Sequence, residues 1–308
     1  MGINNVPDNE DSVVEFRTSQ IRPIRQLFES IKNKLPDTSL LFHPECMKIL
    51  QVDTAQTFLV DVKLHGENFD HYYCNPGRGE SEQQHIEINL NAENLNAVFK
   101  SVTKEDQIFT FTYKYKSNHV ELEFHNPKKK EVKCFVIPIQ NPENDDDFTE
   151  ITPAMIDEYS YRMSMLTSDL TSICKTLKNI NCDSMQIRHD TNTLKFSSTG
   201  DTRGNIIRTG TTYSEKEDDE QLTFIKVPTG EGPYSGKFKF STFYEFSKSQ
   251  GNGDNKIVQI LLEKDKPIIL HYEIGTLGEM YIAMAAFEAD DDDEDDDDDD
   301  DDENDFTN

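Results

Sequence analysis

The stretch Ile24–Ile31, IRQLFESI, places apolar side chains at its first, fourth, fifth and eighth positions. The same spacing recurs in Leu95–Val102 (LNAVFKSV) and in Leu170–Leu177 (LTSICKTL). An i, i+3, i+4, i+7 pattern brings four side chains to one face of an α-helix. We therefore predict three short amphipathic helices, each packed against a core along one face.

The helices are predicted to extend slightly beyond these stripes. The first runs over residues 19–34, with Ser19 as its N-cap and Pro23 in its first turns, where proline is best tolerated. The remaining helices are predicted over residues 91–102, 168–180 and, with a less regular apolar stripe, 241–249.

Strand-like runs fill the intervals between the helices, with the alternating or continuous apolar residues of half-buried and buried strands. Strands are predicted at residues 13–17, 39–43, 48–52, 57–64, 71–74, 85–90, 107–114, 119–124 and 131–137, and then at 159–165, 184–189, 193–198, 205–212, 222–226, 236–240, 256–264, 267–274 and 278–287. Each half therefore has the order strand, helix, strands, helix, strands. We predict an α+β fold of two similar domains, each with two helices packed on antiparallel sheets.

The segment 139–158 separates the two halves. It is acidic, contains two prolines and only isolated apolar residues, and predicts an extended interdomain linker. We accordingly expect a disordered extension at 1–12, a first domain at 13–138, the linker at 139–158, a second domain at 159–288 and a disordered acidic tail at 289–308.

The formal net charge of −28 is unevenly distributed. Residues 288–308 contain 16 acidic residues and no basic ones, whereas the other 287 residues hold 43 acidic and 31 basic residues. Because a uniformly acidic surface repels DNA, any nucleic-acid role requires basic side chains gathered on one surface.

The sequence lacks common signatures of membrane insertion, secretion and catalysis. It has no run of 18 apolar residues, no signal-peptide pattern, and no HExxH, GxSxG or P-loop string. Its five cysteines are scattered without a CxxC pair, which indicates neither a zinc site nor a disulfide framework. We expect an intracellular protein that is not an enzyme, binds no membrane and holds no metal or cofactor.

Basic residues lie one position past the apolar stripes, as Arg25 follows Ile24 and Lys32 follows Ile31. One position is about 100° of helical rotation, so these side chains share an angular sector. The candidate DNA-contacting residues are Arg22, Arg25, Lys32, Lys34, Lys100, Lys175, Lys178 and Lys248. Spacing alone also fits ordinary solvated helix charges.

Several strings resemble the proliferating cell nuclear antigen family of sliding clamps. In the first half they are Gly66–Cys74 (GENFDHYYC), His85–Leu90 (HIEINL) and Ala97–Lys100 (AVFK). In the second half they are Ile173–Leu177 (ICKTL), Leu194–Gly200 (LKFSSTG) and Pro267–Ile274 (PIILHYEI). The similarity covers about residues 13–287, and its specificity lies in the order and spacing of the strings.

The resemblance implies a homotrimeric closed ring whose helices line a central hole and whose sheets form the outer wall. It implies a processivity factor that encircles double-stranded DNA without sequence preference and tethers DNA polymerase, a clamp loader and other peptide-motif proteins. Subunits of this family join through edge strands, which correspond here to Glu131–Ile137 and Asn205–Thr212. Since Gln26 and Ala97 stand where the family usually has lysines, a less positive inner surface is expected.

The family also binds short partner peptides in an apolar pocket beside the linker. The matching residues are Val52, Ile151, Pro153, Pro267, Ile282, Met284 and Ala285. A second interpretation is that Phe148 and Ile151 merely hold the linker on the sheet. Gln56 stands where the family commonly has histidine, so the preferred partner motif stays open.

Two other functions stay open at the level of sequence. One is a processivity factor of the same fold that works as a monomer or dimer, as in herpesviruses. The other is an acidic scaffold or histone-binding protein whose tail is the active part. The asparagine content, the insertions and the tail suggest a divergent clamp from a large DNA virus, working in a nucleus or at a cytoplasmic replication site.

Overall fold

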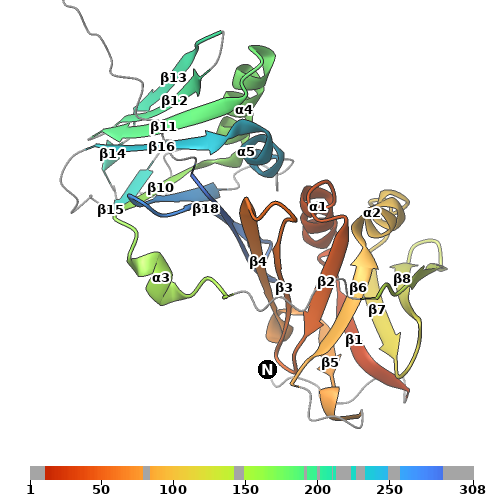
Figure 1. Ribbon diagram of the computed structural model, residues 1–308. Coiled ribbons are helices and arrows are strands. Elements are labelled where there is room, and N and C mark those ends of the chain that lie inside the picture. Colours follow the sequence, from red (N-terminus) through yellow and green to blue (C-terminus); the bar gives the residue numbers. More distant parts are fainter. Residues whose placement is uncertain are drawn as a thin grey trace, which may run out of the picture.

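The structure, a computed structural model, describes residues 11–78, 84–141, 149–190, 193–199, 202–209, 211–212, 223–226, 233–248 and 257–286. Its strands form three sheets, with four helices on one side of the molecule (Figure 1). The acidic tail, most of the amino-terminal extension and Phe148 lie outside the described residues. No helix in the described part of the chain is long and apolar enough to cross a membrane.

The first half of the chain builds a five-stranded antiparallel sheet. In spatial order its strands are β5 (His71–Cys74), β1 (Ser12–Thr18), β7 (Ile108–Lys114), β8 (His119–Asn126) and β9 (Glu131–Pro138). Strand alternation turns Phe16, Phe111 and Phe124 to the same side, where all three are buried. The strand β9 lies at the edge of this sheet.

The second half builds a four-stranded sheet of related design. Its strands are, in spatial order, β13 (Asn205–Thr209), β12 (Thr193–Thr199), β11 (Ser184–Asp190) and β16 (Tyr234–Lys239). The strand β13 lies at the edge of this sheet, and Ile187 and Phe196 are fully buried on its inner strands.

Both halves contribute to a ten-stranded central sheet. Its strands are, in spatial order, β14 (Thr211–Thr212), β15 (Thr223–Lys226), β10 (Tyr161–Leu166), β17 (Ile257–Leu262), β18 (Ile268–Ile274), β19 (Gly278–Met284), β4 (Phe58–His65), β3 (Cys46–Val52), β2 (Asp37–Phe42) and β6 (Ile86–Asn91). The halves meet where β19 pairs antiparallel with β4, from Gly278 opposite Leu64 to Met284 opposite Phe58. Only β14 and β15 pair in parallel among the described strands.

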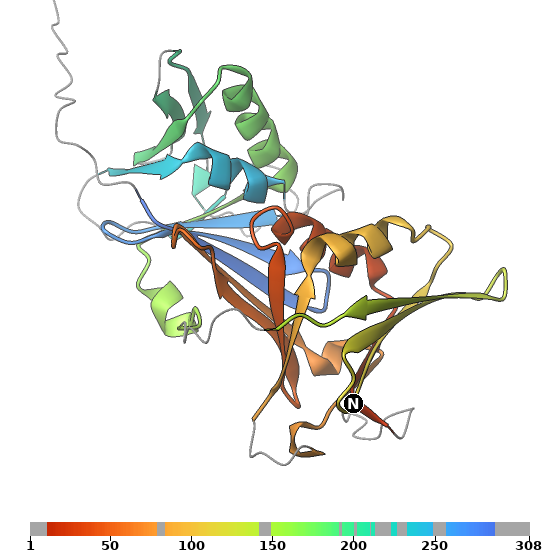
Figure 2. The same ribbon diagram turned by 45° about the vertical axis from the view of Figure 1, so that its right-hand side comes forward.

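The four long helices form one layer on the sheets (Figure 2). They are α1 (Ile21–Ile31), α2 (Ala92–Lys100), α4 (Thr167–Asn179) and α5 (Phe240–Ser247). Helix α1 contacts α2 on one side and α5 on the other, and α5 contacts α4, so the helices of the two halves form a continuous row. The predicted stripes are buried in α1 and α4, and all of the α2 stripe packs on the core.

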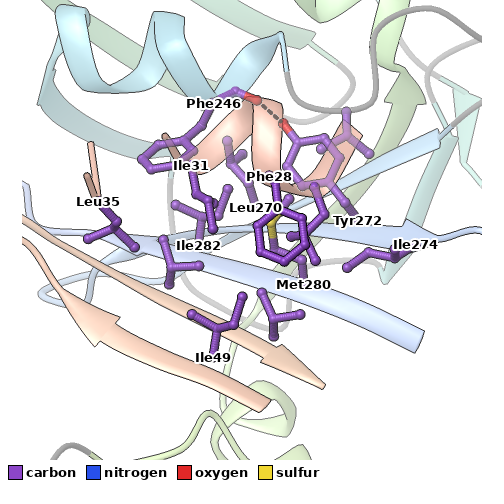
Figure 3. Close-up of a cluster of buried hydrophobic side chains, with 14 of the residues drawn as sticks. Phe28, Ile31, Leu35, Ile49, Phe246, Leu270, Tyr272, Ile274, Met280 and Ile282 are labelled. Carbon is purple, nitrogen blue, oxygen red and sulfur yellow. Dashed lines mark hydrogen bonds between the residues drawn. The ribbon is translucent and has the colours of Figure 1, made fainter. Parts of the chain in front are cut away.

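The core beneath this layer is shared by the two halves (Figure 3). Phe28 of α1 and Phe246 of α5 pack over Leu270 of β18 and Ile282 of β19. The Tyr272 hydroxyl donates a hydrogen bond to the Phe246 carbonyl oxygen at 3.1 Å. Each large apolar side chain buried in this way contributes about 1.5–3 kcal/mol, so the core resists separation of the two halves.

Three local predictions were wrong. The strand predicted at residues 205–212 is divided into β13 and β14, which belong to different sheets. The linker is not extended throughout, because Pro153–Asp157 form the short helix α3, capped by a hydrogen bond from the Met155 amide to the Thr152 hydroxyl at 3.3 Å. Ser19 is not the N-cap of α1: Gln20 holds that position, and the Ser19 amide instead donates to the Asp70 carboxylate at 2.6 Å. Short 3₁₀ turns also occur at Gly66–Asn68 and Pro76–Arg78.

The junction of β19 with β4 depends on a residue without a side chain. A Cβ atom at Gly278 would collide with the Lys63 carbonyl oxygen and press on the Leu64 backbone. We predict that Gly278→Ala lowers the free energy of unfolding in urea by about 1–3 kcal/mol, the usual cost of overpacking.

Gly77→Ala is the matched control, since its new methyl group would meet only the Asn75 side chain at 3.7 Å. This control is expected to change stability by less than about 0.5 kcal/mol. Equal stability of the two variants would contradict the close approach of β19 and β4.

Candidate functional site

All eight predicted basic residues lie on the helices of the four-helix layer or just after them. The side of this layer that faces away from the sheets is here called the helical surface. Arg22 and Arg25 belong to α1, with Lys32 and Lys34 immediately after it. The others lie on α2, on α4 and directly after α5, at Lys100, Lys175, Lys178 and Lys248. None of the eight is buried, and five of them are exposed. The row of helices therefore contains basic residues from both halves of the chain.

The helical surface also carries one acidic side chain tied to these bases. The Glu245 carboxylate accepts hydrogen bonds from Lys248 Nζ at 2.9 Å and from Asn33 Nδ2 at 3.2 Å. Burial acts to raise the pKa of Glu245, but these two bonds and the nearby Lys34 charge hold it below its ordinary value. Glu245 is thus a carboxylate at neutral pH, and it links α5 to the end of α1.

Both edge strands present exposed apolar side chains. On β9, Val132 is 50% and Val136 is 62% exposed, and on β13 Ile207 is 59% exposed. Large β-branched side chains on a strand with unpaired backbone groups favour pairing with another strand. The two edge strands belong to different sheets, one built by each half of the chain.

A cavity of about 360 Å³ opens on the other face of the central sheet, where α3 and the linker lie (Figure 1). Four of the predicted pocket residues line it: Val52, Ile151, Pro267 and Ala285. The lining is mainly apolar and also includes Leu59, Met155, Tyr159, Ile269 and Ala283. Lys266 and Glu158 stand among the lining residues as an ion pair at 2.5 Å.

Three of the predicted pocket residues do not line this cavity. Ile282 and Met284 are buried in the shared core, on the opposite face of β19 from Ala283 and Ala285, because successive strand residues face opposite sides. Pro153 is the first residue of α3 and is exposed. The prediction that Ile282 and Met284 line the pocket was therefore wrong, and the residues that follow them, Ala283 and Ala285, line it instead.

The linker is anchored beside the cavity by a small apolar cluster. Ile151 and Tyr159 pack with Leu261 and Ile269, so Ile151 both holds the linker and lines the cavity. The Ile151 amide donates to the Asp61 carboxylate at 2.7 Å. Burial raises the pKa of Asp61, and the Ile151 amide opposes this shift only in part.

Sequence reasoning missed several residues of these sites. Leu59 and Ile269 could have been found from strand alternation, since each points to the face opposite the buried core residues of its strand. Asp61 was missed because a single carboxylate in a strand gives no signal of its buried partner. In the described part of the chain, no group of three or more His, Cys, Asp or Glu side chains could hold a metal ion.

Comparisons with known proteins find similarity to one family in both halves of the chain. Residues 13–148 match the profile described as the amino-terminal domain of proliferating cell nuclear antigen, and residues 155–287 match its carboxy-terminal domain. The probable DNA polymerase sliding clamp 1 of Paramecium bursaria Chlorella virus 1 is 25% identical over 278 residues, covering 90% of this chain and 98% of the relative.

Two further relatives are more distant in identity. The probable DNA polymerase sliding clamp of Acanthamoeba polyphaga mimivirus is 21% identical over 326 residues, covering 91% of this chain and 63% of the relative. The proliferating cell nuclear antigen of Dictyostelium discoideum is 23% identical over 264 residues, covering 86% of this chain and 95% of the relative.

The hydrogen bond between Asp61 and the Ile151 amide predicts different stabilities for two substitutions of Asp61. Asp61→Ala leaves the Ile151 amide without its acceptor and should lower stability by about 1–3 kcal/mol. Asp61→Asn keeps an oxygen acceptor and removes the charge. At pH 7, which is above the ordinary pKa of an Asp carboxyl, folding must either bury the Asp61 charge or bind a proton, because burial raises the pKa of Asp61. Asn avoids this cost and keeps an acceptor for the Ile151 amide, so it should be less destabilising than Ala. Urea unfolding and hydrogen exchange at Ile151 measure both effects, and identical behaviour of the two variants would refute this contact.

Proposed function

The chain belongs to the proliferating cell nuclear antigen family, and we propose that it works as a DNA sliding clamp, a processivity factor that encircles duplex DNA and tethers DNA polymerase to it. The observation that carries this proposal is the single helical layer with its eight bases. Contacts between lysine or arginine and phosphates need no particular base sequence. They also weaken steeply with salt, as a clamp that must slide requires.

We propose further that three copies close into a ring by pairing β9 of one subunit with β13 of the next. The exposed Val136 and Ile207 on these two edges support a head-to-tail contact, since each edge alone would leave apolar surface and backbone groups uncovered. This arrangement favours a ring over a monomeric or dimeric clamp of the herpesvirus type, because a monomer or an open head-to-tail dimer leaves one β9 edge and one β13 edge uncovered.

The apolar cavity beside the linker is proposed as the docking site for short peptides of the polymerase, the clamp loader and other replication proteins. Its volume of about 360 Å³ and its apolar lining suit the anchor side chains of a peptide. We propose no catalytic activity, because the sites described here bind and position partners. We propose that the protein works inside the cell, in a nucleus or at a cytoplasmic viral replication site, because its proposed partners are those of DNA replication.

The ring proposal predicts how single edge variants behave. The wild-type chain should elute with light-scattering mass near three times 35.5 kDa. Val136→Asp blocks β9 and Ile207→Asp blocks β13, and each alone should give monomers because a buried unpaired carboxylate is strongly unfavourable. The decisive sample is an equimolar mixture of the two variants. In this mixture the intact β13 of the Val136→Asp chain can pair with the intact β9 of the Ile207→Asp chain, so a heterodimer should form. A mixture that stays monomeric would show that the two edges do not pair with each other.

The pocket proposal predicts a loss of partner binding without loss of the ring. Val52→Asp puts a charge at the cavity and should reduce stimulation of a clamp-dependent DNA polymerase on primed template by at least about tenfold. Ile257→Asp is the matched control, because Ile257 is 54% exposed and lies outside the cavity. Both variants should keep the trimer mass. Equal stimulation by the two variants would mean that the cavity is not the docking site.

A further inference from the structure

One aromatic side chain on the helical surface lies against two cations from different helices. The Tyr244 ring of α5 has Lys178 Nζ of α4 at 4.5 Å from its centroid and Lys248 Nζ at 3.9 Å. Both distances are within the range of cation–π attraction, which is about 0.5–1 kcal/mol at exposed sites. We infer that Tyr244 is a positioning residue that holds Lys178 and Lys248 together as one phosphate-binding unit; this rests on the proposed function.

Without a group between them that attracts both, the ammonium groups of Lys178 and Lys248 would not remain close to each other. Their ammonium groups carry like charges, and each stands at the end of a long side chain with about 2 kcal/mol of rotamer entropy. The π system of Tyr244 attracts both ammonium groups, so a single ring holds the two side chains near each other. The Tyr244 ring is itself held, since it packs against Phe240 one turn earlier at a centroid distance of 5.7 Å.

The unit is also fixed to the first half of the chain. Lys248 donates to Glu245, and the second carboxylate oxygen of Glu245 accepts from Asn33, which follows α1. The cluster therefore joins α4, α5 and the end of α1, where Lys32 and Lys34 add further bases. Lysines held in place in this way lose less side-chain entropy when a phosphate binds, so the site is preorganised for the DNA backbone.

The role of Tyr244 was not visible in the sequence. Spacing marked Lys178 and Lys248 as candidate phosphate contacts, but these residues are 70 positions apart and only the packing of α4 on α5 brings them to the same ring. A tyrosine between Phe243 and Glu245 on an apolar helix looks like one more packing residue, although it is only half-buried here.

The test compares Tyr244→Leu, which removes the ring but keeps apolar bulk, with Tyr244→Phe, which keeps the ring. Binding to a mixed-sequence linear duplex is measured by fluorescence anisotropy over a series of NaCl concentrations. The Leu variant should bind about three- to tenfold more weakly at low salt and show a shallower salt slope, approaching the double variant K178Q/K248Q. The Phe variant should restore wild-type affinity and slope.

A double-mutant cycle separates positioning from a general structural effect. Adding Tyr244→Leu to K178Q/K248Q should change affinity by less than about twofold, because the lysines that the ring positions are already gone. Full additivity, or wild-type binding by the Leu variant, would overturn the role of Tyr244 while leaving the clamp proposal intact. If K178Q/K248Q binds DNA as tightly as the wild type, then Lys178 and Lys248 do not contact DNA. The positioning role inferred for Tyr244 would then also be wrong.

A measurement on the wild-type trimer avoids dependence on the folding of the Leu variant. The εCH₂ proton resonances of Lys178 and Lys248, assigned from the single glutamine variants, should be displaced by the Tyr244 ring current. Duplex DNA should shift both resonances together. Two resonances at the positions of free lysine would refute the stacked arrangement.

Discussion

The pairing of β19 with β4 is the contact on which the rest of this structure depends. It joins a strand from the end of the chain to a strand from its first half, and it turns two separate sheets into one of ten strands. Gly278 permits the close approach, because any larger side chain would meet the Lys63 backbone. A junction made by main-chain hydrogen bonds along the whole of β19 fixes both the distance and the angle between the two halves.

Because this junction is fixed, the central sheet has one face that supports the helices and another that supports the linker and the apolar cavity. On one face the shared core supports a row of four helices, with Phe28 and Phe246 packed over both halves (Figure 3). On the other face the linker is held through Ile151 and Tyr159 beside an apolar cavity. The DNA contacts and the peptide contacts proposed for this clamp are therefore separated by the thickness of one sheet, and each can be occupied while the other is in use.

The helices and most strands could be predicted from the sequence because their signals are local. The stripe in Ile24–Ile31 and the alternation in Ile108–Lys114 each identify one element and its buried side. Helix α3 was missed although Thr152 and Pro153 form a recognisable helix start, since the acidic, proline-containing context favoured a linker.

The candidate sites were less predictable because they depend on which segments meet. Met280, Ile282 and Met284 occupy alternate positions of β19 and are buried, whereas the residues between them, Tyr281 and Ala283, are only partly buried. Alternation therefore assigns the first three to the core, but residues carried over from the family placed two of them in the pocket. The cluster around Tyr244 and the Asp61 contact both join residues that are far apart in sequence. No spacing rule connects such positions before the fold is known.

In the arrangement proposed here, three copies of this chain enclose DNA topologically. The most direct measurement is retention on DNA of different topology, after loading onto a nicked circular duplex by a clamp loader and gel filtration at moderate salt. A closed ring should remain on the circle and leave when a restriction enzyme cuts it once, because the ring slides off the free ends. Equal retention on circular and cut DNA would contradict encirclement and indicate ordinary binding to the duplex surface.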